Sequence, residues 1–527
     1  MMKKTISLLM SVAMMACVAG CGNGQSVRSS DTGSYPKGTI TYPMDTDVKL
    51  TYYVKMPSNI STIVSNYGET KFAQESMKRT GVQIEYIHPA QGNETEQLNL
   101  LIASQNLPDI VETNWLKRDP DSSISKNVIY KLNDYIDDYA PNFKAYLNEH
   151  EDIAKSVMTD AKNYYVFPMV RASEKLLNTS GFFLRADWLQ EAGLSAPETI
   201  EDWDAVLEKF KARPGVEYPI AVQMDSLKYF TGAYHTAEGF YVDNGKVKYG
   251  ALEDGYKQFL QKISEWVGKG YIDENFPIMD FNTMNAKILN GSAGVSFGAG
   301  GGQLGTFLKT KQASEPTYDL VPVPFPVLKK GEKSTYSSRQ LPYSPVSAAA
   351  VTTKCAQPEI AVRYLDYAYS EDGYMLNNFG IEGESYEMKD GYPTFTKLIT
   401  DNPDGMAMAQ ILTTYARSTV EGPFVQDERY IEQYYQLPRQ KEALEVWSQN
   451  DYGSHAIPQI TLTKEESSEF SGIMTEINTY VAESITNFML GKTPVSEYDT
   501  FVKTLHDMNI DKAISIYQAA YDRFLTR

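Results

Sequence analysis

Hydrophobic and polar positions follow a regular order between residues 48 and 112. Apolar residues fall at every second position in 48–54 and 82–86, which predicts two strands, and residues 109–112 predict a short buried strand. Between these strands, the apolar positions of 72–77 and 98–102 recur at helical spacing. The order strand, helix, strand, helix, strand predicts parallel strands joined by right-handed crossovers, with helices on both faces.

Two residues directly after the third predicted strand are candidates for ligand binding. Ligands of open parallel sheets bind at the carboxyl ends of the strands, and Asn114 and Trp115 stand at such an end. The indole of Trp115 is expected either to form a stacking platform or to cover an edge of the hydrophobic core. The pattern leaves both interpretations open.

The middle of the chain has two strong helix patterns and one buried strand. A near capping box at Thr199 begins a helical pattern that ends at Pro214, and residues 256–267 repeat this pattern. Residues 293–298 predict a buried strand. Residues 321–326 carry alternate prolines, which remove ladder donors, so this segment is predicted to be extended and not a central strand.

The first 21 residues have the pattern of a secretory signal. Lys3 and Lys4 precede the apolar stretch 6–15, and small residues lead to Cys21. This arrangement resembles the lipobox of bacterial lipoproteins, in which the signal is removed before a lipid-carrying Cys. The apolar stretch is shorter than the roughly 20 residues that span a bilayer. Residues 22–47, rich in Gly, Ser, Thr and Asn, predict a flexible tether.

Charge and cysteine content narrow the function classes. The formal net charge is −18, and loss of the signal with its two lysines leaves about −20, which disfavours nucleic-acid binding. Cys355 is the only thiol left besides the lipidated Cys21, so neither a disulfide framework nor a cysteine metal site is expected. About 480 residues follow the tether, enough for two or more domains.

Two glycine motifs lie at and after residues 293–298. Residues 294–298 match G-x-S-x-G with Ser296 as the nucleophile, but no oxyanion motif precedes them and glycines follow instead of a helix. Residues 300–305 match G-x-G-x-x-G, but the proline-rich segment beyond them fits a dinucleotide fold poorly. We therefore expect no catalytic residue and no cofactor, and predict a flexible glycine loop that approaches a ligand, with Gln303 as a hydrogen-bonding side chain.

Aromatic composition is more informative than the titratable residues. The five histidines are scattered, which disfavours a metal site, and no carboxylate pair stands out as that of a glycoside hydrolase. The chain has 37 Tyr, 21 Phe and 5 Trp. Tyrosine combines a ring face with a hydroxyl, which suits sugars. The densest aromatic cluster lies in residues 229–241, in a stretch with loop character.

Four sequence blocks occur in a characteristic order. Residues 183–203 read Phe-Leu-Arg-Ala-Asp-Trp-Leu, then Gly-Leu, Pro-Glu-Thr and Trp, and are followed by the blocks 245–273, 378–386 and 491–521. The first block is similar to R-x-DWL-x-x-x-GL-x-x-P-x-T in the extracellular solute-binding proteins of family 1. The whole chain after the signal resembles the LplA-like lipoproteins of carbohydrate ABC importers in that family.

The resemblance implies an α/β, two-lobe periplasmic-binding-protein-like (type II) fold with an interlobe hinge and extra C-terminal helices. The implied organisation is a signal peptide (1–20), a lipid-anchored tether (21–47), a first lobe (48–165, completed by part of 320–400), a second lobe (166–318), return segments (319–400) and a mostly helical C-terminal part packed on the lobes (401–527). The implied cleft residues are Asn114, Trp115, Arg185, Tyr234, Gln303, Arg339, Tyr343 and Glu382. Arg185 could instead form a structural ion pair with Asp187.

The resulting prediction is a non-catalytic monomer, lipid-anchored through Cys21 to the extracellular face of the cell membrane. It would capture a carbohydrate, expected to be an oligosaccharide, and deliver it by lobe closure to the permease subunits of an ABC importer and their cytoplasmic ATPase. No cofactor, metal or nucleic acid is expected. Two alternatives stay open: a secreted hydrolase acting on polysaccharide, and a binding protein for a peptide or another non-sugar solute.

Overall fold

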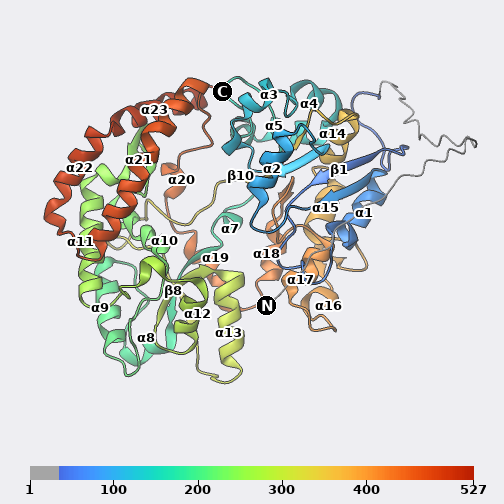
Figure 1. Ribbon diagram of the computed structural model, residues 1–527. Helices are drawn as coiled ribbons and strands as arrows, with labels where there is room; N and C mark the ends of the chain where they lie inside the picture. Colours follow the sequence, from blue (N-terminus) through green and yellow to red (C-terminus); the bar gives the residue numbers. More distant parts are fainter. Residues whose placement is uncertain (1–34) are drawn as a thin grey trace, which may run out of the picture. The chain divides into compact units, whose positions relative to one another are not determined.

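The computed structural model of the chain describes residues 35–527 (Figure 1). The predicted signal peptide, the lipidation site Cys21 and residues 22–34 of the predicted tether lie outside the described residues. We call residues 37–171 and 343–434 the first lobe, and residues 180–322 and 438–527 the second lobe. Each lobe has its own sheet and hydrophobic core.

The first lobe is built on a six-stranded mixed sheet with the order β13-β4-β10-β3-β1-β2. Its strands are β1 (Lys49–Tyr53), β2 (Gln83–Ile87), β3 (Ile110–Thr113), β4 (Phe167–Arg171), β10 (Tyr343–Val351) and β13 (Phe424–Gln426). β1 is parallel to β2 and β3, and β10 runs antiparallel between β3 and β4. The predicted parallel unit of three strands and two helices is confirmed by this pairing.

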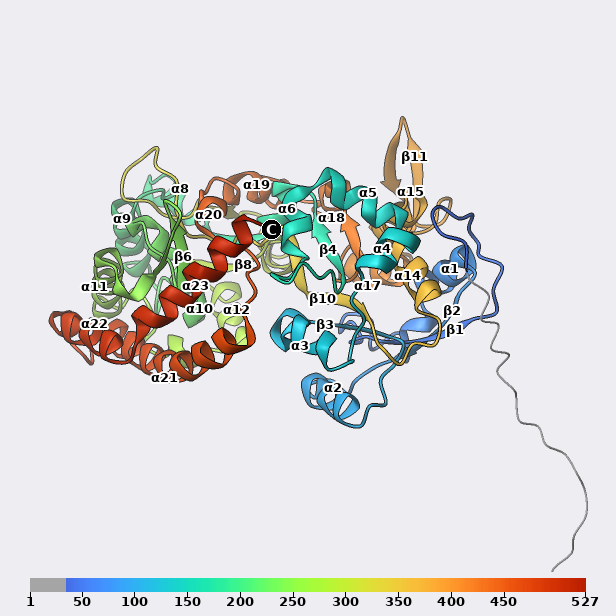
Figure 2. The same ribbon diagram turned by 90° about the horizontal axis from the view of Figure 1, so that it is seen from above.

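Helices cover this sheet, and a hairpin projects from the lobe (Figure 2). The helices are α1 (Lys71–Thr80), α2 (Glu94–Ala103), α3 (Pro120–Ser125), α4 (Asn133–Tyr139), α5 (Pro141–Glu149), α6 (Glu151–Ser156), α14 (Pro358–Tyr367), α15 (Glu371–Phe379), α16 (Lys397–Thr400), α17 (Met408–Tyr415) and α18 (Glu428–Tyr434). The hairpin consists of β11 (Tyr386–Lys389) and β12 (Tyr392–Phe395).

The second lobe has a three-stranded sheet, β8-β5-β9, in which β5 (Ser180–Arg185) is antiparallel to both β8 (Val295–Ala299) and β9 (Leu320–Pro322). β9 lies at the edge, as its proline requires. The other elements are α8 (Ala186–Ala192), α9 (Ile200–Lys211), α10 (Met224–Leu227), the 3-10 helix η3 (Lys228–Tyr234), the hairpin β6 (Phe240–Asp243) and β7 (Lys246–Tyr249), α11 (Asp254–Gly268), α12 (Phe281–Leu289) and α13 (Gly305–Gln312).

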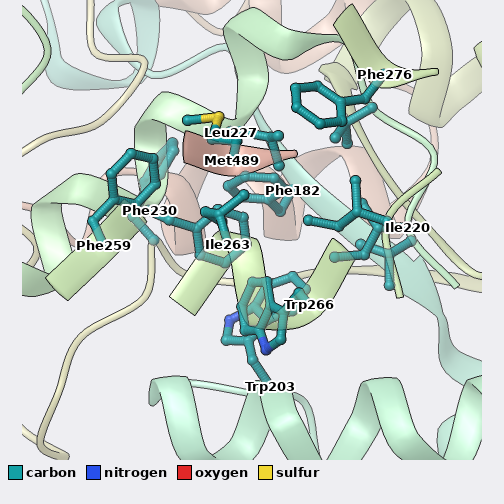
Figure 3. Close-up of a cluster of buried hydrophobic side chains, with 14 of the residues drawn as sticks. Phe182, Trp203, Ile220, Leu227, Phe230, Phe259, Ile263, Trp266, Phe276 and Met489 are labelled. Atoms are coloured by element: carbon teal, nitrogen blue, oxygen red, sulfur yellow. The ribbon is translucent and has the colours of Figure 1, made fainter. Parts of the chain in front are cut away.

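Aromatic side chains fill the second-lobe core (Figure 3). The predicted capping box is present, because the Thr199 hydroxyl and the side chain of Asp202 each accept a backbone N–H at the start of α9. Trp203 of α9 and Trp266 of α11 pack edge-on against Phe230, and all three side chains are buried. The two predicted helical stripes are therefore core positions, where burial of large rings contributes most to stability.

The C-terminal helices pack on the second lobe, and the last three of them, α21 to α23, lie along one side of it (Figures 1 and 2). They are α19 (Pro438–Trp447), α20 (Tyr452–His455), α21 (Lys464–Met489), α22 (Tyr498–Asp507) and α23 (Ile510–Leu525). The residues before α19 do not pack on the second lobe, because α17, β13 and α18 belong to the first lobe. The region predicted as one C-terminal part is thus divided between the two lobes.

Three segments cross between the lobes. They are residues 172–179, which include α7 (Glu174–Leu177), residues 323–342, and residues 435–437. The first crossing begins later than predicted: β4 pairs with β10 and β13, so the first lobe extends to Arg171 and does not end at residue 165.

Part of the predicted tether is packed on the first lobe. The backbone N–H groups of Gly38 and Met44 donate to the carbonyls of Asp138 and Thr80, at 2.8 and 2.9 Å. The Tyr42 hydroxyl donates to the carbonyl of Arg363 at 2.8 Å. The prediction of a free tether is therefore wrong for residues 38–44, because these hydrogen bonds hold the segment in place.

Candidate functional site

A cavity of about 700 Å³ opens where the parallel strands of the first lobe end. We call it the first-lobe cavity. Its lining comes from the segment after β1, the segment after β2, the end of β3, the middle of β10 and the loop after α17: residues 53–59, Tyr67, Pro89, Glu94, Glu112, Thr113, Val346, Ser347, Arg417 and residues 419–421. The carboxyl ends of parallel strands are the expected ligand position in such sheets.

A buried ion pair forms part of the cavity wall. Arg417 Nη2 donates to both carboxylate oxygens of Glu112, at 2.8 and 3.0 Å, and Tyr52 Oη donates to the same carboxylate at 2.7 Å. Burial opposes the charge of Arg417 most strongly, but the Glu112 carboxylate and the nearby tyrosines Tyr67, Tyr52 and Tyr86 together outweigh it, so the pKa of Arg417 is raised. Burial also raises the pKa of Glu112. Arg417 therefore holds its proton more strongly than an ordinary arginine, and Glu112 is easier to protonate than an ordinary glutamate.

Apart from Glu94 Oε1, which is in the ion pair with Lys55, three buried polar atoms of residues lining this cavity have no hydrogen-bond partner within the described chain. They are the hydroxyl of Tyr67, Nε of Arg417 and Oδ1 of Asn59. Buried polar groups are nearly always hydrogen-bonded, and leaving one unpaired costs about 1–3 kcal/mol. Two can donate and two can accept, so together they suit a ligand rich in hydroxyl groups.

The other charged residues at the cavity are already paired. Lys55 Nζ lies 2.9 Å from Glu94, and Arg171 Nη2 lies 3.1 Å from Glu421. The Lys55 ammonium, with backbone N–H groups at the start of α2, lowers the pKa of Glu94 to about 2. The Glu94 carboxylate is therefore charged at any physiological pH.

An aromatic ladder lies in the second lobe. Tyr229 of η3 stacks on Phe297 of β8 with centroids 4.9 Å apart, and on Tyr336 of the 323–342 crossing at 5.8 Å. Tyr452 of α20 meets Tyr336 edge-on at 4.9 Å. Tyr229, Phe297 and Tyr452 stay partly exposed. Such half-exposed ring faces are suited to stack on sugar rings.

A groove of about 690 Å³ has walls from both lobes. One wall is residues 116–121, which follow β3. Helix α3, which begins in this segment, lies on the side of the first lobe that faces α21 in Figure 2. Opposite are Phe240 and Tyr517, whose rings stack at 4.4 Å, with Phe470 stacked on Tyr517 at 4.3 Å. Thr113 lines the first-lobe cavity and Leu116 lines this groove, so the chain after β3 connects the two openings.

The two residues predicted after β3 do not both face a ligand. Trp115 is fully buried, and its indole N–H donates to the Val111 carbonyl at 2.9 Å. The prediction of a cleft residue is wrong for Trp115, because its ring completes a core cluster; covering the core edge was the other open interpretation. Asn114 is partly buried and its Oδ1 accepts the Lys117 backbone N–H at 3.2 Å, which places it between cavity and groove.

Arg185 and Tyr234 are structural in this fold. Arg185 makes a two-pronged ion pair with Asp187 and is sandwiched between the rings of Trp188 and Tyr318, at 4.6 and 4.3 Å. It lies at the far end of β5 from the ladder, since Phe297 pairs with Phe182 in β5. The structural ion pair was the alternative left open for Arg185. Tyr234 is buried in the second-lobe core.

The glycine-rich segment is a helical turn and not a ligand loop. Residues 300–304 form a π-helical turn, and Gln303 Oε1 accepts the Ala299 backbone N–H at 2.9 Å within that turn. A Cβ on Gly300 or Gly301 would lie 2.7–2.8 Å from the rings of Tyr435 and Tyr434. The glycines therefore allow close contact between the lobes. The prediction of a flexible loop is wrong, because residues 300–304 form a helical turn, whereas the ligand role of Gln303 stays a prediction.

The remaining predicted residues lie apart from the first-lobe cavity. Arg339 holds Glu174 with two hydrogen bonds of 3.0 and 2.7 Å and lines a third cavity, of about 570 Å³, together with Tyr343. Tyr343 is 2% exposed. Glu382 is exposed in the turn before β11. Of the eight predicted residues, only Arg339 and Tyr343 share a cavity.

The serine of the G-x-S-x-G match is not exposed. Ser296 lies within β8, is fully buried, and its hydroxyl donates to the Ala221 carbonyl at 3.0 Å. A nucleophile elbow requires an exposed serine on a sharp turn.

Within residues 35–527 there is no group of three or more His, Cys, Asp or Glu side chains placed to hold a metal ion.

Sequence reasoning missed the main polar residues of the first-lobe cavity. Glu112 could have been found from its place at the carboxyl end of β3, by the rule that selected Asn114. Arg417 lies 305 residues away and carries no local signal. The ladder was partly visible, since Tyr229 belongs to the aromatic cluster seen in the sequence.

Helices long and apolar enough to cross a membrane do not occur in the part of the chain that the structure describes.

Comparison with known proteins gives consistent results. The model of the family described as bacterial extracellular solute-binding protein matches residues 62–375. The chain is 25% identical over 560 residues to the fructooligosaccharide ABC transporter substrate-binding protein FusA of Streptococcus pneumoniae serotype 4, with 98% of each chain covered.

Solved structures share the fold. The alginate-binding protein AlgQ2, solved without calcium ion, has a TM-score of 0.74 at 22% identity, covering 92% of this chain and 100% of that chain. FusA of S. pneumoniae in complex with kestose has a TM-score of 0.70 at 21% identity, covering 91% and 99%. The predicted two-lobe α/β fold is confirmed.

Proposed function

The chain belongs to the bacterial extracellular solute-binding proteins, and on this premise we propose that it captures an oligosaccharide for an ABC importer. The observation that carries the proposal is the first-lobe cavity, with its unpaired polar atoms of Tyr67, Arg417 and Asn59. Its volume of about 700 Å³ lies within the usual range for small-molecule sites, about 300–1,000 Å³. FusA, similar over 98% of the chain, is by name a fructooligosaccharide-binding protein, which supports a saccharide ligand.

Binding would close the two lobes around the sugar. A hinge equilibrium moves toward the closed state when the ligand contacts both lobes in that state. The first-lobe cavity would supply hydrogen bonds and the ladder residue Tyr229 a stacking face. The three crossing segments are the proposed hinge, with the Gly300–Tyr435 contact as a point about which the lobes pack.

The closed protein would dock on the permease subunits of the importer, which are driven by a cytoplasmic ATPase. Cys21 would carry the lipid that anchors this monomer to the outer face of the cell membrane. The part of the predicted tether that precedes the described residues would let the body reach the permease.

Capture without catalysis is the proposed activity. The buried hydroxyl of Ser296 supports it, because a serine hydrolase needs that group at the surface of a site.

Calorimetric titration of the purified protein with a panel of gluco-, fructo-, galacto- and manno-oligosaccharides tests the proposal, with each mixture analysed for cleavage products. We expect at least one sugar to bind without being cleaved. Y229A should weaken that binding about tenfold, equal to about 1.4 kcal/mol, through loss of the ring face.

Tyr218 is the matched control, since it is a half-buried second-lobe tyrosine that does not belong to the aromatic ladder. Y218A should bind as the wild type does. Absence of binding across the panel, or cleavage of a bound sugar, would contradict the proposal.

A further inference from the structure

We infer that the sugar unit held in the first-lobe cavity is uncharged, and that the cavity rejects uronic acids. This inference rests on the proposed capture of a saccharide and narrows its substrate class. The similar proteins span both classes by name: fructooligosaccharides are neutral, whereas alginate is a polymer of uronic acids. The choice between them must come from this chain's own residues.

Charge at the cavity does not favour an anion. Among the described residues that line it, Lys55 and Arg417 are cations, whereas Glu94, Glu112 and Glu421 are carboxylates. Both cations are bound to lining carboxylates, Lys55 to Glu94 at 2.9 Å and Arg417 to Glu112 at 2.8 Å. A sugar carboxylate at Lys55 or at Arg417 Nη2 would therefore have to displace a lining carboxylate, and at Arg417 Nε it would meet a guanidinium whose charge Glu112 already offsets.

The third carboxylate adds to this effect. Glu421 forms an ion pair with Arg171, a cation that does not line the cavity, and it also accepts a hydrogen bond from the hydroxyl of Ser344 at 3.1 Å. The lining thus has one more carboxylate than cations. The adjoining groove brings Lys117 and Arg118 together with Asp119 and Asp121, so it contributes no excess positive charge. An acidic ligand would lose its hydration without an opposite charge to replace it.

The unpaired polar atoms match neutral hydroxyls. Arg417 Nε can only donate, Asn59 Oδ1 can only accept, and the Tyr67 hydroxyl can do either. A sugar hydroxyl both donates and accepts, so one CH₂OH or ring hydroxyl can satisfy groups of both kinds. A carboxylate accepts only, so in the place of a CH₂OH group it could not donate to Asn59 Oδ1.

Matched sugars that differ only at C6 test the inference. The pairs are β-1,4-mannotriose against β-1,4-trimannuronate and α-1,4-galactotriose against α-1,4-trigalacturonate, measured by titration calorimetry beside kestose, nystose and the other neutral sugars of the panel. We expect the best neutral sugar to bind at least 100-fold more tightly than either uronate. A uronate that binds within tenfold of the best neutral sugar would overturn the inference and leave the proposed capture of saccharides intact. Silence of every sugar, neutral and acidic, would overturn the proposed function itself.

A gain-of-function variant gives an independent measurement. E421Q keeps an oxygen for Ser344 and Arg171 but releases the positive charge of Arg171 beside the cavity. It should raise the affinity for trigalacturonate or trimannuronate about tenfold over wild type, with an effect that decreases at high salt.

E75Q is the matched control, because Glu75 is a first-lobe carboxylate that pairs with Arg79 on α1, outside the cavity. It should leave uronate affinity unchanged. Equal affinities in E421Q, E75Q and wild type would show that Glu421 does not exclude acidic sugars, against the inference.

Discussion

Removing Arg417 should destabilise the protein strongly, because it leaves Glu112 charged and buried. The side chains of Arg417 and Glu112 are only 8% and 2% exposed, and Arg417 donates to both carboxylate oxygens. Unit charges about 4 Å apart at an effective dielectric constant of about 20 attract by about 4 kcal/mol. Breaking such a pair from one side usually costs about 3–5 kcal/mol. We expect a loss of this size for R417M in the free energy of unfolding.

The double variant E112Q/R417M separates this effect from lost packing. It removes both charges, and the Gln oxygen still accepts the Tyr52 hydroxyl, so it should recover to within about 1 kcal/mol of wild type. Urea unfolding at pH 7, followed by tryptophan fluorescence, measures all three proteins. K503M is the control for an exposed pair, Lys503 with Asp507, and should cost less than about 0.5 kcal/mol.

Acidification gives the same test without a second mutation. Since burial raises the pKa of Glu112, this carboxyl is protonated early on acidification, and in R417M the missing cation raises its pKa further. The deficit of R417M relative to the double variant should therefore shrink as the pH falls from 7 to 5. Equal stabilities of R417M and E112Q/R417M at pH 7 would refute the reasoning, because the cost would then come from packing and not from an unpaired charge.

Three further predictions concern stability. Burial raises the pKa of Asp366 from 3.8 to about 6, so the native state keeps a proton that the unfolded chain has released; the contribution of Asp366 to the unfolding free energy should fall by about 3 kcal/mol between pH 4 and 6, measured as the difference between wild type and D366N in urea titrations. G181A would place a Cβ 2.4 Å from the buried ring of Trp447 and should cost about 1–3 kcal/mol by calorimetry, whereas G268A meets nothing within 4 Å and should not. Asp160 of the first lobe binds Arg523 and Arg527 of the second at 2.6 Å each, so D160N should cost about 1.5–3 kcal/mol in thermal unfolding; an equal loss in D152N, where the carboxylate is in no ion pair, would contradict an interlobe role.

Local patterns in the sequence were sufficient for the secondary structure near the site. The alternation in 48–54 and 82–86 predicted β1 and β2, and the Thr199 capping box predicted the start of α9. These features depend on neighbours a few residues apart, which is why periodicity reveals them. The boundary at β4 was missed because strand pairing with β10, more than 170 residues away, decides which lobe that strand joins.

The candidate site depended on contacts that no local pattern encodes. Trp115 has a side chain suited to stack on a sugar, yet the elements packed over it bury the ring in the hydrophobic core. In the sequence, Gly300 and Gly301 are typical of a ligand-binding loop. In the structure they contact Tyr435 and Tyr434, which leave no room for a Cβ.

The sequence by itself determined the parallel first-lobe unit, the helical stripes and the family, because each depends on residue order and spacing. Only the tertiary structure decided which aromatic rings stay exposed, that Glu112 meets Arg417, and that the cations at the cavity are already paired. The reason is that exposure and charge pairing are set by residues distant in the chain that folding brings within a few ångströms.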